Sequence, residues 1–116
     1  FPRAIAPSQL GVYPLVNKDG IDKKARKIHE QLLDEGFTAE LDETGSIGRR
    51  YARADEAGVP LGITVDYDTM TDNSVTIRDR DSWRQVRTPI KSLSELLHKY
   101  FQRKIDFEDL GTYLTA

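Results

Sequence analysis

The chain has 116 residues, which is enough for one domain with a modest core and too few for two. It contains no cysteine, and this excludes disulfide bridges, thiolate zinc sites and cysteine nucleophiles. Its 17 basic and 19 acidic residues give a formal net charge of −2, whereas a protein that binds polyanions over its whole surface is usually basic. Any binding of nucleic acid must therefore come from a local patch.

The chain is expected to have three segments. Residues 1–7 contain two prolines and no helical pattern, which predicts a linker from a preceding domain. Residues 8–104 are patterned throughout and are predicted to form the domain itself, followed by a C-terminal tail over residues 105–116. Because the chain does not begin with Met, we expect it to be a piece of a longer protein. It has no apolar run long enough to cross a membrane and no signal segment.

The first half of the chain alternates strands and helices. Residues 10–16 are apolar and rich in β-formers, which predicts a buried strand. From Ile21 to Gly36 the apolar residues form a single helical stripe, and residues 37–41 alternate as a second strand does. A loop over residues 42–45 then leads into a helix that is expected to end at Gly58.

The second half begins with three strands that follow one another closely. They are predicted over residues 61–67, 74–78 and 83–88, with turns at residues 68–73 and at Asp81-Ser82. A last helix is expected to start at Ser92, because Ser92 and Glu95 have the spacing of a capping box. Residues 106–116 are expected to be a weak helix or a packed end.

The element order predicts an α/β fold with a mixed five-stranded sheet flanked by three main helices. Two strand–helix–strand units imply parallel pairing, and the short connections between the later strands imply antiparallel pairing. Ligands of such sheets favour the loops beyond the carboxyl ends of parallel strands. Asn17, Lys18 and residues 45–53 follow strands there, so we expect them to share one rim.

The sequence offers no catalytic centre. His29 and His98 lie in predicted helices without a Ser–Asp partner set or metal-ligand spacing. The glycines at positions 45 and 48 lack the Lys-Ser/Thr of a phosphate loop and the third glycine of a dinucleotide site. We therefore expect this domain to contain no catalytic residue, metal or cofactor.

The helix that follows Gly45 has an unusual distribution of charge. Ser46 is a good N-cap, yet Arg49 and Arg50 occupy the first turn, where the helix dipole is already positive. Arg53 lies four residues after Arg49, a like-charge spacing that mildly destabilises a helix. These arginines indicate an anion such as phosphate at the helix start, and with Arg78–Arg87 they predict a local basic face.

A second arginine cluster lies on the predicted strand pair over residues 74–88. Thr76, Arg78 and Arg80 share one strand face, opposite Val75 and Ile77. Alternation with Asp79 and Asp81 is typical of a solvated face with ion pairs, but the same groups can read base edges. Trp83 is expected to be a packing residue.

Several motifs, in this order and spacing, resemble the C-terminal anticodon-binding domain of glycyl-tRNA synthetase, of the archaeal and eukaryotic class II type. The resemblance covers residues 6–101. It rests on the segments VNKDG (16–20), GSIGRRYARADEAGVP (45–60), TVDYD (64–68) and DNSVTIRDRD (72–81). It implies a mixed five-stranded sheet with three main helices, as the element order does. The ATP-binding motifs of that family's catalytic domain are absent.

The resemblance implies that the chain binds the anticodon stem-loop of glycine tRNA. The anticodon bases that pair with the two guanines of a glycine codon are cytosines, whose edges suit Arg and Asp. The match assigns base reading to Arg78, Asp79 and Arg80, and phosphate and base contacts to the helix-start arginines. The full set of RNA-binding residues expected is Asn17, Lys18, Ser46, Arg49, Arg50, Arg53, Arg78, Asp79, Arg80 and Arg87.

The resemblance also implies a parent enzyme that charges glycine tRNA in protein synthesis. That enzyme is expected to use ATP and magnesium, to be a homodimer and to lie in the cytoplasm. Two alternatives remain at this point. One is an accessory protein that reuses the domain without catalysis, as a polymerase accessory subunit does. The other is an α/β module that binds a small molecule or phosphate at the turn over residues 45–48.

Overall fold

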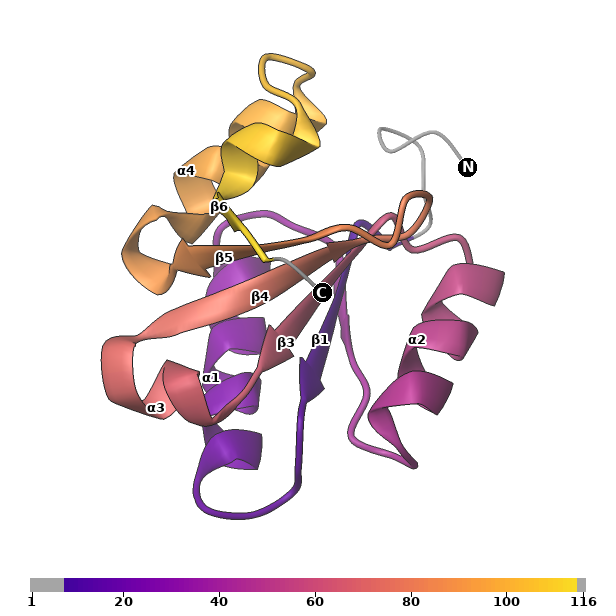
Figure 1. Cartoon of the computed structure of the whole chain (residues 1–116), viewed down its shortest axis with the longest axis vertical. Helices are drawn as coiled ribbons and strands as arrows, with labels where there is room; N and C mark the ends of the chain where they lie inside the picture. The colour runs from indigo at the N-terminus through magenta and orange to yellow at the C-terminus, as the bar shows by residue number, and fades with distance from the viewer. Residues whose placement is uncertain (1–7, 115–116) are drawn as a thin grey trace.

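A mixed six-stranded sheet forms the centre of the computed structural model, which describes residues 8–114. The strands are β1 (Leu10–Pro14), β2 (Ala39–Leu41), β3 (Leu61–Val65), β4 (Ser74–Asp79), β5 (Gln85–Pro89) and β6 (Thr112–Tyr113), in the order β2-β1-β3-β4-β5-β6. The helices are α1 (Ile21–Asp34), α2 (Ile47–Glu56), α3 (Tyr67–Asp72), α4 (Ile90–Phe101) and the 3-10 helix η1 (Phe107–Leu110) (Figure 1). The predicted linker over residues 1–7 lies outside the described residues.

The pairing of the strands confirms the predicted mixed sheet. β1 pairs in parallel with β2 and with β3, and α1 and α2 make the two connections. The pairs β3–β4, β4–β5 and β5–β6 are antiparallel. The pairing is parallel in the first half because helices connect its strands, and antiparallel in the second half because the links between its strands are short, as the sequence indicates.

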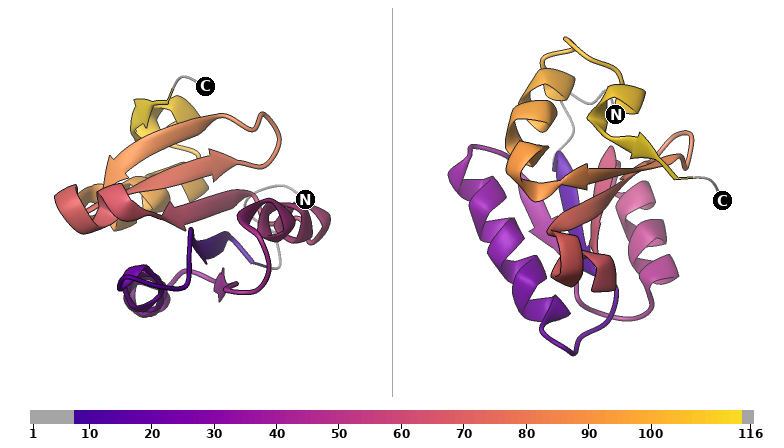
Figure 2. Two further views of the ribbon diagram at one scale, coloured as in Figure 1. Left: turned by 60° about the horizontal axis from the view of Figure 1, so that its bottom comes forward. Right: turned by 60° about the vertical axis from the view of Figure 1, so that its left-hand side comes forward.

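Helices cover the two faces of the sheet unequally. Alternate strand residues, such as Val12, Ile63 and Ile77, point into the main core, which α1 and α4 close. The other face carries Tyr13 and packs against α2 through a much smaller apolar cluster that includes Ala54. Figures 1 and 2 show α1 and α2 on opposite sides of the sheet. We call the side that bears α2 the α2 face.

The expected turn over residues 68–73 is a short helix, α3. The Asp66 side chain accepts hydrogen bonds from the Thr69 N–H and hydroxyl, and the Thr69 hydroxyl accepts one from the Asp66 N–H. This reciprocal cap starts a helix and ends β3 at Val65, before the predicted end of the strand at residue 67. Asn73, in a left-handed conformation with φ 60°, closes it.

The last helix starts earlier than its sequence predicts. α4 begins at Ile90, directly after Pro89, so Ser92 and Glu95 lie inside the helix and form no cap. The Ile90 N–H donates to the Asn73 carbonyl at 2.9 Å, across the sheet end, and this satisfies a group that would otherwise need a cap. A proline is well suited to the residue before such a start, because its φ is already fixed.

The segment expected to be a tail adds the sixth strand. Phe107 and Leu110 are buried, and the Thr88 hydroxyl donates to the Leu110 carbonyl at 2.5 Å. The chain then pairs Thr112 and Tyr113 with β5. The expectation of five strands is therefore too low by this short edge strand. Two residues are too few to show a strand periodicity in the sequence.

Among the helices of the described part of the chain, residues 8–114, none is long and apolar enough to cross a membrane.

The close approach of Gly111 to β5 gives a test of this fold. A Cβ at position 111 would lie 2.3 Å from the Arg87 carbonyl oxygen and 2.4 Å from the Thr88 hydroxyl oxygen. We expect Gly111→Ala to lower the free energy of unfolding in urea by about 1–3 kcal/mol, because backbone must move. Gly48→Ala is the control. A Cβ there meets no atom within 4 Å, and the helix gains roughly 0.5–1 kcal/mol. Equal stability of Gly111→Ala and the wild type would contradict this account.

Candidate nucleic-acid interface

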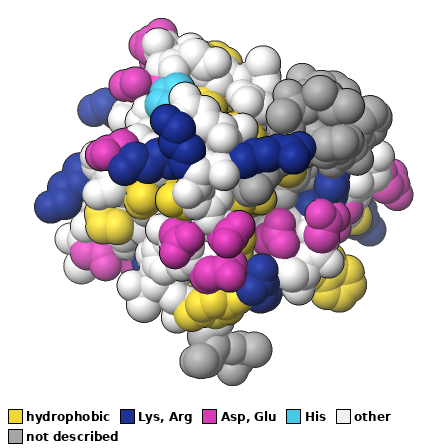
Figure 3. All heavy atoms as spheres, turned by 90° about the horizontal axis from the view of Figure 1, so that it is seen from above, with side chains coloured by type: hydrophobic (Ala, Val, Ile, Leu, Met, Phe, Trp, Pro, Cys, Tyr) yellow, Lys and Arg dark blue, Asp and Glu magenta, His cyan; other side chains and the backbone are white. Residues whose placement is uncertain are grey.

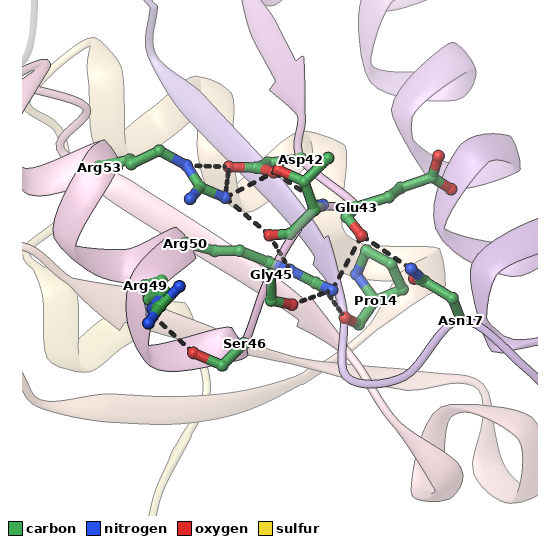
Figure 4. Close-up of polar contacts among 10 residues, drawn as sticks. Pro14, Asn17, Asp42, Glu43, Gly45, Ser46, Arg49, Arg50 and Arg53 are labelled. Carbon is green, nitrogen blue, oxygen red and sulfur yellow. Dashed lines mark hydrogen bonds and ion pairs between the residues drawn. The ribbon is translucent and has the colours of Figure 1, made fainter.

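Arg50 clamps the loop that precedes α2. Its side chain donates to the carbonyl oxygens of Thr44 at 3.1 Å, of Glu43 at 3.0 Å and of Gly45 at 2.9 Å, and also to that of Pro14. Figure 4 shows the guanidinium pointing inward among these carbonyls. Arg50 is only 3% exposed, and its positive charge faces backbone carbonyl oxygens instead of the expected anion. Its role is to join the loop to the end of β1.

Arg53 forms an ion pair instead of remaining free for phosphate. Its Nη2 lies 2.7 Å from the Asp42 carboxylate and also donates to the Thr44 carbonyl at 2.7 Å. Burial acts to raise the pKa of Asp42, but hydrogen bonds from Thr44 and Arg53 outweigh it and hold that pKa below 3.8. The carboxylate of Asp42, in the loop before α2, therefore offsets part of the positive charge of the arginines in this helix.

Arg49 differs from these two arginines. It is exposed, and among residues 8–114 its guanidinium has no hydrogen-bond or ion-pair partner, although its backbone N–H donates to the Ser46 hydroxyl at 3.3 Å. Ser46 is exposed and caps the helix as predicted. The first turn of α2 thus presents a cation and a hydroxyl to solvent at a positive helix end.

Asn17 and Lys18 lie on the same rim as this helix start, as the sequence predicts. The Asn17 side-chain amide donates to the Glu43 carbonyl at 2.7 Å, so it braces the loop that Arg50 clamps. Lys18 is exposed beside it in the chain. The Asn17 side chain therefore has a hydrogen-bonding role within the fold, whereas the Lys18 side chain is exposed to solvent.

Arg78, on β4, binds α2 near its C-terminal end and so attaches this helix to the sheet. Its guanidinium donates to both carboxylate oxygens of Asp55, at 3.1 and 3.2 Å, and lies 4.5 Å from the centre of the Tyr51 ring. The Tyr51 hydroxyl in turn lies 2.5 Å from the Thr64 hydroxyl on β3, and burial raises the pKa of Tyr51. Arg78 is thus mostly buried under α2 and positions its neighbours.

Asp79 and Arg80 belong to the tip of the β4–β5 hairpin. Asp79 Oδ2 accepts from the N–H and the hydroxyl of Ser82, at 3.1 and 2.6 Å, and so holds the turn. Arg80 Nη1 donates to the Gly58 carbonyl at 3.0 Å, just beyond α2, and its Nε lies 2.8 Å from the Asp81 carboxylate. Asp81 is exposed and Arg80 is partly covered, so this ion pair lies at the surface of the tip.

Arg87 is the centre of a separate polar network on β5. It donates to both carboxylate oxygens of Asp66 at 2.7 and 2.9 Å, to Ser74 Oγ at 2.7 Å and to Thr76 Oγ1 at 3.0 Å. Burial acts to raise the pKa of Asp66, but the hydrogen bonds from Arg87 and Thr69 outweigh it and lower that pKa below 3.8. Arg87 thereby ties β5 to the cap of α3.

The structure places the more accessible of the predicted residues in two groups, one at each end of α2. Asn17, Lys18, Ser46 and Arg49 lie around the start of α2, and Arg80 lies just beyond its end. A ten-residue helix is about 15 Å long, so one extended RNA segment can reach both groups.

The arginines expected to form a local basic face are largely paired with acidic residues. Arg53, Arg78 and Arg87 each pair with an aspartate that is distant in the sequence. In Figure 3, which looks down on the top of Figure 1, acidic side chains lie beside basic ones. These ion pairs leave the exposed groups at the ends of α2 as small sites instead of parts of one continuous basic face.

Trp83 is a further residue that sequence reasoning placed wrongly. It was expected to pack, but it is 70% exposed at the hairpin tip. Trp83 lies in the turn with φ 61°, a conformation that a sequence pattern of strand and turn does not reveal. Its position beside charged residues was the available signal.

Residues 9–100 match a family model described as an anticodon binding domain. The chain belongs to the anticodon-binding domain family. This match covers the sheet from β1 to β5 together with all four α-helices, and so includes both residue groups at the ends of α2.

Relatives of this anticodon-binding domain include glycine–tRNA ligases of several archaea. The chain is 50% identical over 113 residues to that of Aeropyrum pernix, covering 97% of the chain and 19% of the relative. It is 50% identical over 94 residues to that of Methanocaldococcus jannaschii, covering 81% and 16% respectively. These similarities confirm the resemblance to glycyl-tRNA synthetase and favour neither alternative. The chain spans a fifth or less of the length of these relatives.

The fold of this anticodon-binding domain also occurs in a more distant solved structure. The prolyl-tRNA synthetase of Cryptosporidium parvum superimposes with a TM-score of 0.76 at 23% identity, covering 89% of this chain and 23% of that one. At this level of identity the likeness shows that the two chains share a fold.

The two neighbouring arginines of α2 provide a matched test of the clamp. Arg50→Met leaves several carbonyl oxygens without donors, and we expect the free energy of unfolding to fall by roughly 2–5 kcal/mol. Arg49→Met removes an exposed charge from a positive helix end, so stability is expected to change by less than about 0.5 kcal/mol. Urea denaturation measures both. Equal losses in the two variants would show that the clamp is not what stabilises the loop.

The Asp66–Arg87 pair predicts a dependence of stability on pH. Because the pKa of folded Asp66 lies below 3.8, the pair stabilises the fold fully near neutral pH and loses this contribution as the pH falls through the folded pKa. Asp66→Asn keeps an N-cap but not the charge. We expect this variant to be less stable at pH 7 by about 1–3 kcal/mol and to lose less stability than the wild type below pH about 4. Parallel pH profiles of the two proteins would refute the assignment.

Proposed function

We propose that this chain is the anticodon-recognition module of a glycine–tRNA ligase and that it binds the anticodon stem-loop of glycine tRNA. The observation that carries the proposal is the 50% identity to a glycine–tRNA ligase over 97% of the chain. The positive first turn of α2, with exposed Arg49 and Ser46, supports it, because such a helix end suits a phosphate group.

The contacts of each arginine suggest how the roles divide. Arg49 and Lys18 contact the RNA backbone, since both are exposed at the rim. Arg80 reads a base edge, and its exposed neighbour Asp81 supplies the acceptor for a cytosine amine that we had expected from Asp79. Arg50, Arg53 and Arg78 hold the loop and α2 in position, as their contacts within the fold indicate.

The proposal extends to the parent enzyme. A catalytic domain outside this chain would charge the tRNA with ATP and magnesium, and the enzyme would be a cytoplasmic homodimer. The residues described here do not fit a magnesium site, because residues 8–114 contain no group of three or more His, Asp or Glu placed to hold a metal ion. No step of that chemistry is assigned to this chain.

The experiment that tests the proposal is a binding titration with RNA hairpins. The 116-residue chain is titrated with a labelled stem-loop that carries a glycine anticodon and with stem-loops in which either of its two cytosines is replaced. We expect each replacement to weaken binding by about 1–3 kcal/mol. Absence of binding to every hairpin, or equal binding to all of them, would overturn the proposal.

The first turn of α2 gives a variant with a distinct signature. Arg49→Gln is expected to weaken binding equally for all hairpins and to reduce the slope of log K against log salt by about 1. Lys91→Gln is the matched control, because Lys91 is also an exposed cation in the first turn of a helix, but in α4, on the other face of the sheet. An unchanged salt slope in Arg49→Gln would remove Arg49 from the interface.

A further inference from the structure

Trp83 is the single tryptophan of the chain, and it is 70% exposed at the tip of the β4–β5 hairpin. Its φ of 61° is in the left-handed region, which a bulky residue rarely adopts. A large aromatic ring held mostly in water by a strained backbone is costly for a fold that gains little packing from it.

The hairpin holds Trp83 in place through a set of short contacts. The Trp83 N–H donates to the Asp79 carbonyl at 2.9 Å, and the Asp79 N–H donates to the Arg84 carbonyl at 2.9 Å. The Asp79 carboxylate fixes Ser82, the residue before Trp83, through two further hydrogen bonds. The ring is therefore presented by an ordered turn and is ready for a partner.

Trp83 is the outer member of a row of flat groups. The Arg78 guanidinium lies 5.8 Å from the centre of the Trp83 ring and 4.5 Å from that of the Tyr51 ring on α2. Asp55 holds this guanidinium through both of its carboxylate oxygens. Tyr51 and Arg78 are largely covered, so Trp83 is the member that remains open to a ligand.

We propose that the Trp83 ring stacks on an unpaired base of the RNA that this domain binds. The inference rests on the proposed function and deepens it, because it adds a stacking residue to the arginine sites. Unstacked bases of RNA loops bind aromatic rings, and the contact tolerates any base. Trp83 therefore contributes affinity, while discrimination between bases stays with the polar groups at the tip.

The neighbours of Trp83 favour a base over an apolar protein surface. Asp81, Ser82 and Arg84 adjoin it, and all three are exposed and polar. Exposed apolar side chains such as Tyr67 and Met70 belong to α3, at the far end of β4, whereas exposed Tyr113 on β6 lies near the hairpin, where its hydroxyl accepts from Arg84 Nη1 at 2.6 Å. A surface that docks a protein normally has contiguous apolar area, whereas aromatic rings set among polar groups suit unstacked bases.

Intrinsic fluorescence tests the proposal in the unmodified chain, because all tryptophan emission comes from Trp83. The chain is titrated with the glycine-anticodon stem-loop while Trp83 emission and the anisotropy of labelled RNA are followed. We expect quenching of the emission with the same midpoint as the anisotropy change. Binding without a change in emission would overturn the stacking and leave the proposed function intact. No binding at all would overturn both.

Substitutions separate stacking from simple apolar contact. Trp83→Leu and Trp83→Ala are expected to weaken binding of every hairpin by a similar factor, roughly 5- to 100-fold, and Trp83→Tyr to retain most of the affinity. Met70→Ala removes an exposed apolar side chain at the other end of β4 and serves as the control. Urea denaturation of each variant confirms that it is folded. If Trp83→Leu binds as tightly as the wild type, stacking is wrong.

Discussion

Guanidinium groups hold α2 on the sheet, and the arrangement of the candidate site depends on this. Among residues 8–114, the buried apolar cluster beneath α2 consists of Tyr13, Ala54 and Val59, with Ile47 and Tyr51 partly buried against it, and is far smaller than the core on the other face. Arg50 binds loop carbonyls at one end of the helix, and Arg78 binds Asp55 near the other. Hydrogen bonds that involve a charged group are the stronger ones, so a few arginines can replace a larger apolar interface.

This means of attachment explains how a chain with a net charge of −2 can carry so many arginines in two short segments. Most of them serve the fold and are neutralised by aspartates or by carbonyl dipoles. Arg49 at the helix start and Trp83 at the hairpin tip remain open at the two ends of α2. The distance between these two exposed groups is therefore set by contacts within the fold.

The sequence predicts the mixed sheet and the three long helices because their apolar residues repeat with the period of a strand or of a helix. It does not predict α3, whose start depends on the reciprocal Asp66–Thr69 cap, or β6, which has only two residues. Nor does it predict which arginines are free. The partners Asp55–Arg78 and Asp66–Arg87 are 23 and 21 residues apart, so only the folded sheet brings them together. The rim that joins Asn17 to the start of α2 was predictable, since loops after parallel strands meet at one edge.

Hydrogen exchange of the native protein tests most directly whether arginines, rather than apolar packing, hold α2. Amide protection is compared in α2 (Ile47–Glu56) and α1 (Ile21–Asp34) for the wild type and for Arg78→Met. This substitution keeps an unbranched side chain over Tyr51 but removes the contact with Asp55. The account predicts that protection falls in α2 and is retained in α1, because the helix opens locally without global unfolding. Unchanged protection in α2, or an equal loss in both helices, would contradict it.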